Sequence, residues 1–255
     1  MILLATAILA SCALLSPAIT PPLEPPQDPP LKEPTPRQTP APDAILYHTL
    51  TGRDAQVVFT SDAPLEQVVG KSNAVVGYAI AGPKDQPAKL ADATWILPIK
   101  SLATGIPLRD QHLAGKEWLD AETYPNIQFV LKRVGDIKEI KRGDGFTTWS
   151  ATLTGDMTIH GITHELNVAD ARLSFFQESP KTRAIAAGDL LFLKCEYAVK
   201  LSDFGIQNPD VPKKVSDSVK LTQTLKLSTV LAQVPKGPDG EPAKEPGKET
   251  SGGLP

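Results

Sequence analysis

Cysteine is scarce in this sequence, with two residues, Cys12 and Cys195, in a chain of 255. Cys12 lies in an apolar N-terminal run. Whether it is lipidated or removed with that run, Cys195 is left without a partner in the mature chain, so we expect no internal disulfide. Cys195 lies on the apolar side of the alternating segment 191–197, a position that favours a buried, inert thiol over a nucleophile.

An excess of basic charge is also absent. The chain has 26 Lys and Arg against 29 Asp and Glu, a formal net charge of −3, and no basic block. A phosphate backbone is recognised through clustered Lys and Arg, so we expect no nucleic acid partner. Aromatic residues are few, and the 3 Trp, 4 Tyr and 7 Phe all lie between Tyr47 and Phe204, which indicates one folded domain.

A complete catalytic set is missing too. The best candidates are Arg109, Asp110 and His112, since an imidazole beside a carboxylate could act as a general base. No nucleophile-elbow serine or cysteine, glycine-rich phosphate loop or second carboxylate accompanies them. The alternative, which we favour, is that Arg109 and Asp110 cap and anchor a short helix while His112 satisfies buried backbone groups.

Metal ligands are also too few. His160 and His164 flank a turn, and two histidines rarely hold zinc without a third and a fourth ligand. We expect them to be surface turn residues and expect neither a metal nor another cofactor.

What the chain has in abundance is proline at its N-terminal end. Residues 1–12 form an apolar signal peptide that is too short for a permanent membrane span, and residues 9–12, Leu-Ala-Ser-Cys, have the form of a lipobox with Cys12 as the lipidated residue. An ordinary cleaved secretion signal is the alternative. Residues 13–42 are a proline-rich linker, either an extended spacer or a ligand for a partner domain.

Residues 43–234 carry the features of a folded domain, whereas the proline-, glycine- and charge-rich tail 235–255 is expected to be disordered. Apolar and polar residues alternate with period two in many short segments of this domain, for example in 191–201 and 219–227. Turn signals separate these segments, so we predict an antiparallel all-β protein. The alternation alone fits both a sandwich and a closed barrel.

One stretch, residues 101–131, combines unlike features: an apolar segment ends, a short helix and a turn follow, and a second strand begins. We expect the helix at 109–113 and inward positions for Leu108, Leu113, Trp118 and Leu119. The stretch contains Thr104-Gly105, Arg109-Asp110-Gln111-His112-Leu113, Trp118-Leu119-Asp120-Ala121 and a Tyr-Pro-x-Ile-x-Phe segment ending at Phe129. Two further segments follow it in order, residues 155–163 (GDMTIHGIT) and 201–206 (LSDFGI).

Together these three segments resemble the motifs of the YceI-like family, lipocalin-like barrels that bind polyisoprenoid lipids. The resemblance implies an eight-stranded antiparallel barrel with a short capping helical segment, and Thr104, Gly105, Arg109, Asp110 and His112 are its motif residues. Inward apolar residues are then the candidate ligand contacts. They are Trp118, Phe129, Leu153, Met157, Leu166, Leu193 and Tyr197.

The expected function is non-catalytic binding, sequestration or transport of an isoprenoid or similar long-chain lipid. The expected location is the bacterial periplasm or cell envelope, with the membrane reached through a lipid on Cys12. Two alternatives stay open at this point: a structural envelope lipoprotein with a protein partner, and an enzyme that uses His112 and Asp110 on a lipid head group.

Overall fold

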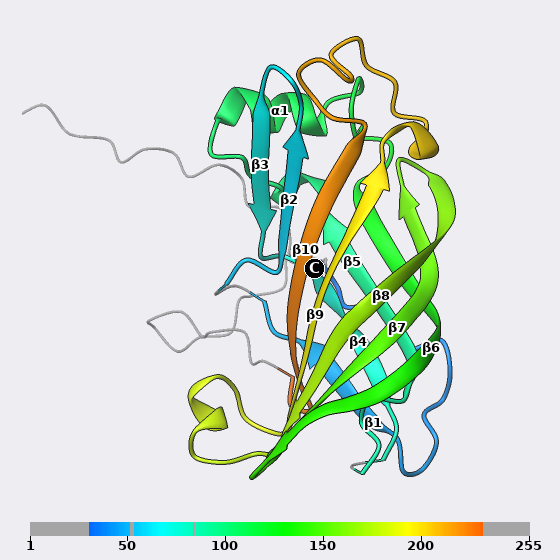
Figure 1. Cartoon of the computed structure of the whole chain (residues 1–255), viewed down its shortest axis with the longest axis vertical. Coiled ribbons are helices and arrows are strands. Elements are labelled where there is room, and N and C mark those ends of the chain that lie inside the picture. Colours follow the sequence, from blue (N-terminus) through cyan, green and yellow to red (C-terminus); the bar gives the residue numbers. More distant parts are fainter. Residues whose placement is uncertain (1–30, 52–53, 84, 232–255) are drawn as a thin grey trace, which may run out of the picture. The chain divides into compact units, whose positions relative to one another are not determined.

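The computed structural model describes residues 31–51, 54–83 and 85–231. This part of the chain folds into ten strands and one α-helix (Figure 1). The helix is α1 (Pro107–Ala114), and three 3₁₀ turns are η1 (Ile99–Ser101), η2 (Thr182–Ala184) and η3 (Ser202–Phe204). The strands are β1 (Ile45–Thr49), β2 (Val57–Asp62), β3 (Gln67–Ser72), β4 (Val76–Ala81), β5 (Leu90–Pro98), β6 (Asn126–Gly143), β7 (Phe146–Ile159), β8 (Ile162–Phe176), β9 (Leu190–Lys200) and β10 (Ser218–Ser228).

Eight of the strands close into an antiparallel barrel. Their order is β1-β4-β5-β6-β7-β8-β9-β10, and β1 pairs with β10 through His48 opposite Ser228 to complete the ring. The predicted all-β fold, the eight-stranded barrel and the single short helix are thereby confirmed. No helix in the described ranges is both long and apolar enough to cross a membrane.

The β7–β8 hairpin shows how local sequence determines the register of these strands. His160 and Gly161 form its two-residue turn with φ values of 51° and 75°, the left-handed conformation that a tight hairpin needs at both positions. A Cβ on Gly161 would lie 2.4 Å from the ring of Tyr124, so glycine alone fits there. His160 also contacts Tyr124, edge to face at 4.9 Å. His160 is therefore a turn residue, as expected.

The β2–β3 hairpin replaces β1 and β4 at one end of the barrel. The first half of β10, residues 219–223, pairs with β2, whereas its last residues pair with β1. β3 in turn pairs with the segment that follows β5: Lys71 and Ala103 form two backbone hydrogen bonds of 2.9 Å with each other. In Figure 1 this hairpin lies next to α1. The end of the barrel that carries α1 is thus built from a different set of strands than the opposite end.

The third motif, residues 201–206, lies where β8 and β9 are no longer paired. β8 and β9 pair only between residues 172–176 and 190–194. Further along, η3 packs on β8: the His164 ring Nε2 donates to the Asp203 carbonyl at 2.8 Å, and Phe204 is buried perpendicular to that ring. His164 is therefore an exposed residue that holds a loop.

The segment before β1 packs on the barrel. Pairing between β5 and β6 begins only at Thr94, and Arg37 lies beside the unpaired part of β5. Its side chain pairs with the fully buried carboxylate of Asp92 and donates to the Leu131 carbonyl at 2.7 Å. The Tyr78 hydroxyl donates to the same carboxylate at 2.8 Å. Part of the range assigned to the proline-rich linker, residues 31–42, is thus held against the barrel.

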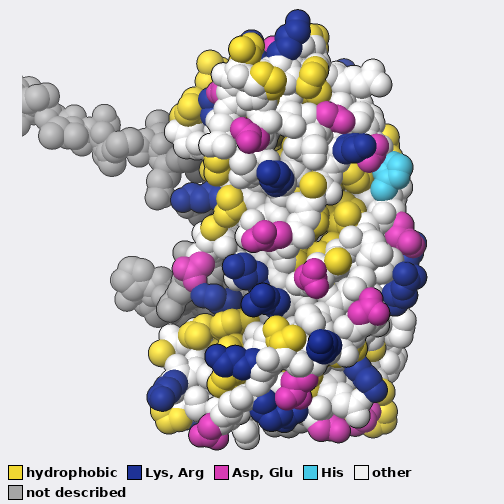
Figure 2. Space-filling model, in the orientation of Figure 1, with side chains coloured by type: hydrophobic (Ala, Val, Ile, Leu, Met, Phe, Trp, Pro, Cys, Tyr) yellow, Lys and Arg dark blue, Asp and Glu magenta, His cyan; other side chains and the backbone are white. Residues whose placement is uncertain are grey.

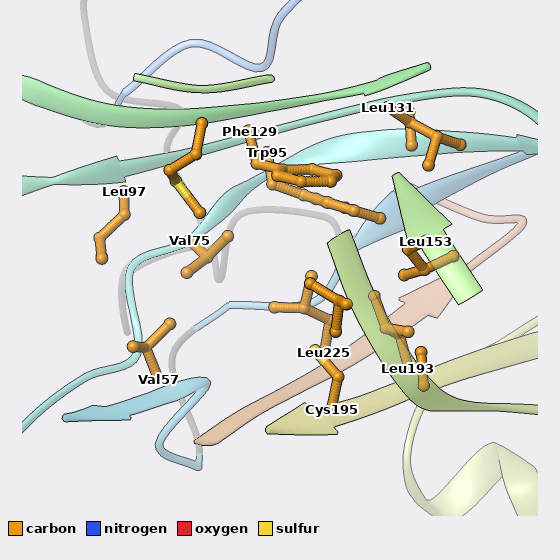
Figure 3. Packing of buried hydrophobic residues seen from close by; sticks show 14 of the residues in the cluster. Val57, Val75, Trp95, Leu97, Phe129, Leu131, Leu153, Leu193, Cys195 and Leu225 are labelled. Carbon is orange, nitrogen blue, oxygen red and sulfur yellow. The ribbon is translucent and has the colours of Figure 1, made fainter. Parts of the chain in front are cut away.

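The signal peptide, Cys12, the linker up to residue 30, and residues 232–255, which include the predicted tail 235–255, lie outside the described residues. Inside the barrel, the period-two pattern is confirmed, because inward positions of β5, β7, β9 and β10 form one buried cluster. Figure 3 shows part of this cluster, with the Trp95 and Phe129 rings stacked between residues that belong to the two ends of the barrel.

Candidate functional site

A cavity of about 400 Å³ lies inside the end of the barrel that carries α1. Its wall is contributed by β2, β3, β5, β6, β7, β9 and β10, by α1 and the segments on either side of it, and by the loop between β9 and β10. Apolar side chains make up nearly all of this wall. They include Val57, Val68, Leu97, Leu102, Ile127, Ile159, Val199, Ile206, Val219 and Leu221.

The cavity ends at a packed layer of side chains. On each of four strands, the residue two positions away from a wall residue belongs to this layer. These residues are Trp95 on β5, Phe129 on β6, Tyr197 on β9 and Gln223 on β10. These four residues border a void of only about 10 Å³. Such a void holds at most one water molecule. The large cavity is therefore blind: it opens at the α1 end and does not continue through the barrel.

Phe129 is held firmly in this layer. Its ring stacks on Trp95 with a centroid distance of 5.7 Å and an interplanar angle of 17°. On another side it lies against Gly155 of β7, where an added Cβ would be 2.4 Å from the ring. The ring therefore fills space that any other residue at position 155 would occupy. Figure 3 shows Leu97 and Val57 on one side of the stacked rings and Leu131 and Leu153 on the other.

The helical cap begins where the sequence requires it to begin. Gly105 has a φ of 82°, which turns the chain after Thr104, and Pro107 occupies the first turn of α1, where its missing N–H costs nothing. Asp110 Oδ1 accepts hydrogen bonds from the Thr104 backbone N–H at 2.7 Å and from its hydroxyl at 2.5 Å. Arg109 pairs with Glu66 in the β2–β3 turn. The motif residues thus anchor the helix over the cavity, although no side chain caps its N-terminus.

Charged groups at the mouth are paired with one another. Arg109 pairs with Glu66, and Lys214 lies 3.1 Å from Asp210. Apolar side chains are exposed beside them: Ile106 is 47 % and Leu108 62 % exposed. The face shown in Figure 2 likewise has apolar side chains at the end that carries α1. The mouth of the cavity is therefore bordered by exposed apolar side chains and by two ion pairs whose charges neutralise each other.

Two expectations about this cap need correction. His112 was expected to satisfy buried backbone groups, but its ring is exposed at the cavity mouth and makes no hydrogen bond with a described residue. Leu108 was expected to point inward, but it lies at the mouth of the cavity and is 62 % exposed. Trp118 faces inward as expected, because it packs against the core and one side of its ring borders the cavity. Leu119 is buried and Leu113 is partly buried, as expected.

The predicted ligand contacts lie in three different places. Trp118 lines the large cavity. Met157 is 5 % exposed within the core. The remaining five border the small void, and these are Phe129, Leu153, Leu166, Leu193 and Tyr197. Their contact with a lipid stays a prediction.

The wall residues that were not singled out, such as Val57, Val199 and Val219, belong to the same alternating segments. The alternation places them on the inward face but carries no separate signal that they border a cavity.

Cys195 does not line the large cavity. It is buried among the packed residues, and this burial, followed by the nearby Glu196 charge, raises the pKa of its thiol to about 12. The thiol is therefore protonated at neutral pH, as expected for an inert cysteine. Among the described residues, no cluster of three His, Cys, Asp or Glu side chains could hold a metal ion. The wall of the cavity can enclose an apolar group.

The model of the YceI-like domain matches residues 49–227, more than half of the chain. This chain belongs to the YceI-like domain family. The match covers β2 to β9, α1 and β10 except for Ser228, and it begins at Thr49, the last residue of β1. The motifs of the cap and of the loop after β9 therefore lie inside the matched range.

Related proteins and structures agree with this assignment. A UPF0312 protein of Pseudomonas savastanoi is 29% identical over 121 residues, which is 48% of this chain and 55% of that protein. A UPF0312 protein of Pseudomonas putida is 28% identical over 112 residues, 43% of this chain and 49% of that protein. The chain thus spans about half the length of the relatives it matches. The crystal structure of Burkholderia cenocepacia BcnA has the same fold, with a TM-score of 0.50, 20% identity, and coverage of 68% of this chain and 95% of that one.

Proposed function

We propose that this protein binds the apolar chain of a lipid in the cavity under α1 and catalyses no reaction on it. The observation that carries the proposal is the cavity itself, about 400 Å³ with a wall that is mainly apolar. Ligand sites of this size are typical for one small molecule, and transfer of apolar surface from water into such a wall is favourable. An isoprenoid chain, which the family resemblance implies, matches this chemistry.

The residues at the cavity mouth favour recognition of the apolar chain of the lipid over recognition of its head group. Both ion pairs at the mouth, Arg109 with Glu66 and Lys214 with Asp210, are partly exposed and already neutralised. A charged head group would have to compete with these existing partners in water, where such contacts contribute about 0–1 kcal/mol. Binding energy therefore comes mainly from apolar burial at about 25 cal/mol per Å².

Native mass spectrometry of the purified full-length protein, followed by lipid extraction, tests the proposal. We expect a hydrocarbon lipid to co-purify in a defined ratio. Neighbouring residues on β3 provide a matched pair of variants, because Val68 is 8% exposed and lines the cavity whereas Val69 is 46% exposed and faces outward. Val68→Asp should lose the lipid, and Val69→Asp should retain it with an unchanged circular dichroism spectrum. Equal lipid loading of the two variants would contradict binding in this cavity.

We also propose that the protein acts in the bacterial cell envelope, held at a membrane by a lipid on Cys12. The support is the lipobox-like sequence of residues 9–12 and the proline-rich segment that follows it. Cys12→Ser should move the protein from the membrane fraction to the soluble fraction. A wild-type protein found in the soluble fraction, with a mature N-terminus other than Cys12 in mass spectrometry, would contradict the anchor.

A further inference from the structure

The depth of the cavity limits how much of a lipid it can enclose. The cavity ends where Trp95, Phe129 and Tyr197 occupy the next inward positions of β5, β6 and β9. Below these residues the barrel is filled, with Leu153 and Leu193 each 2% exposed. A chain that enters under α1 therefore meets a closed floor and cannot pass to the opposite end of the barrel.

This closed floor limits the length of chain that can be enclosed. The cavity of about 400 Å³ lies at the α1 end, and only a void of about 10 Å³ lies next to the Trp95 and Phe129 rings. The part of a long chain that exceeds the depth of the cavity would stay outside, in contact with water.

We propose that the cavity encloses a single chain only over a limited length, and that Phe129, in the layer next to the cavity wall, sets this limit as the floor of the site. The proposal rests on the proposed function, because it specifies the ligand of the same cavity. Phe129 is suited to the role because its ring is fixed by Trp95 on one side and by the bare backbone of Gly155 on another. The floor therefore does not move aside when a longer chain presses on it.

The test measures affinity against chain length. The delipidated full-length protein is loaded with the uncharged fluorescent probe N-phenyl-1-naphthylamine, which is then displaced by saturated primary alcohols of increasing chain length, from decanol to eicosanol. Each enclosed methylene should raise the affinity about fourfold. Because carbons beyond the depth of the cavity stay in water, the affinity should stop rising at a chain length between those of decanol and eicosanol.

Two variants test whether Phe129 sets the limit on chain length. Phe129→Ala should move the plateau to longer chains, because the removed ring opens the space below. Val199→Phe, on the wall above the floor, should move the plateau to shorter chains; it adds volume where the cavity is open and keeps the test valid if Phe129→Ala does not fold. Thr152→Val, on β7 outside the cavity lining, is the control and should leave the plateau unchanged.

The possible failures are distinct. If neither the probe nor any alcohol binds, the proposed function is wrong. If the affinity rises without a plateau up to eicosanol, lipid binding stands and the length limit is wrong. If a plateau exists but neither Phe129→Ala nor Val199→Phe moves it, Phe129 is not the floor.

Discussion

The two ends of the barrel are lined by the same classes of side chain and differ in how well these fill the space between the strands. β9 and β10 show the difference within a single pair of strands. At the α1 end, Val199 lies opposite Val219, and both border the cavity of about 400 Å³. Further along, Leu193 lies opposite Leu225 in the packed half, where they are 2% and 0% exposed.

At this pair of strands, valine on both strands borders the open volume, and leucine on both strands lies in the packed half. Between the two halves lie the stacked Trp95 and Phe129 rings (Figure 3). The strands of the α1 end are also less extensively paired. There the β2–β3 hairpin pairs with the segment after β5 through an isolated bridge between Lys71 and Ala103. We expect variants in the two halves to behave in opposite ways.

The largest expected difference comes from shortening leucine in each half. Leu193→Ala should lower the free energy of unfolding by about 2–5 kcal/mol, because it creates a cavity among close-packed neighbours. Leu221→Ala, on the cavity wall, should cost only about 1 kcal/mol, because this side chain already borders open space and has fewer contacts to lose. Urea denaturation of the two delipidated variants measures both values. Similar losses at the two positions would mean that the α1 end is packed as well.

A somewhat smaller contrast is expected from enlarging a residue in each half. Leu153→Trp should destabilise the protein by about 1–3 kcal/mol, because the added ring must displace neighbours around a void of only about 10 Å³. Val219→Phe should leave the melting temperature of the delipidated protein unchanged or higher and should reduce the extracted lipid per mole. Full stability of Leu153→Trp together with loss of lipid would instead show that the packed half is hollow in solution.

The sequence predicts the barrel better than it predicts the cavity. Period-two alternation in 191–201 and 219–227 marks the strands, because each has one buried face. The alternation is the same above and below the floor, so it marks Leu153 and Val199 as equally inward. Which of them borders a cavity depends on the Trp95–Phe129 stack across from Gly155, a contact between distant strands that no local pattern carries.

The cap and the N-terminal segment give two further examples. The Thr104, Arg109 and Asp110 motif predicts a helix anchored to the barrel, and the structure shows both anchoring contacts. Their exposed neighbour His112 was misplaced, because helix periodicity over so few residues does not tell which side faces the barrel. Arg37 lies in a proline-rich stretch with no periodicity, and only the fold reveals that the buried Asp92 carboxylate is its partner.

The ionisation of Cys195 tests the packed half by a different route. Burial raises the pKa of this thiol to about 12, above the value of 9.0 for an exposed thiol. Between these values the unfolded chain releases the proton and the folded chain keeps it, so the free energy of unfolding should fall as the pH rises, by about 1 kcal/mol per pH unit. Cys195→Ala should remove this part of the slope between pH 9 and pH 11 in urea titrations. An identical slope in the variant would show that the thiol is exposed or already ionised.

The smallest effect is expected at His112, at the mouth of the cavity. The ring is exposed and makes no hydrogen bond with a described residue, so His112→Ala should change the free energy of unfolding by no more than about 0.5 kcal/mol. Lipid binding should also be unchanged, because the apolar wall below the mouth supplies the binding energy. The neighbouring Asp110 carboxylate already accepts two hydrogen bonds from Thr104, so it is committed to anchoring α1 and is poorly placed to act with the imidazole as a catalytic pair. The measurement is displacement of N-phenyl-1-naphthylamine together with mass analysis of the bound lipid after prolonged incubation. A chemically altered head group with the wild type, and an intact one with His112→Ala, would establish catalysis at the mouth in place of simple binding.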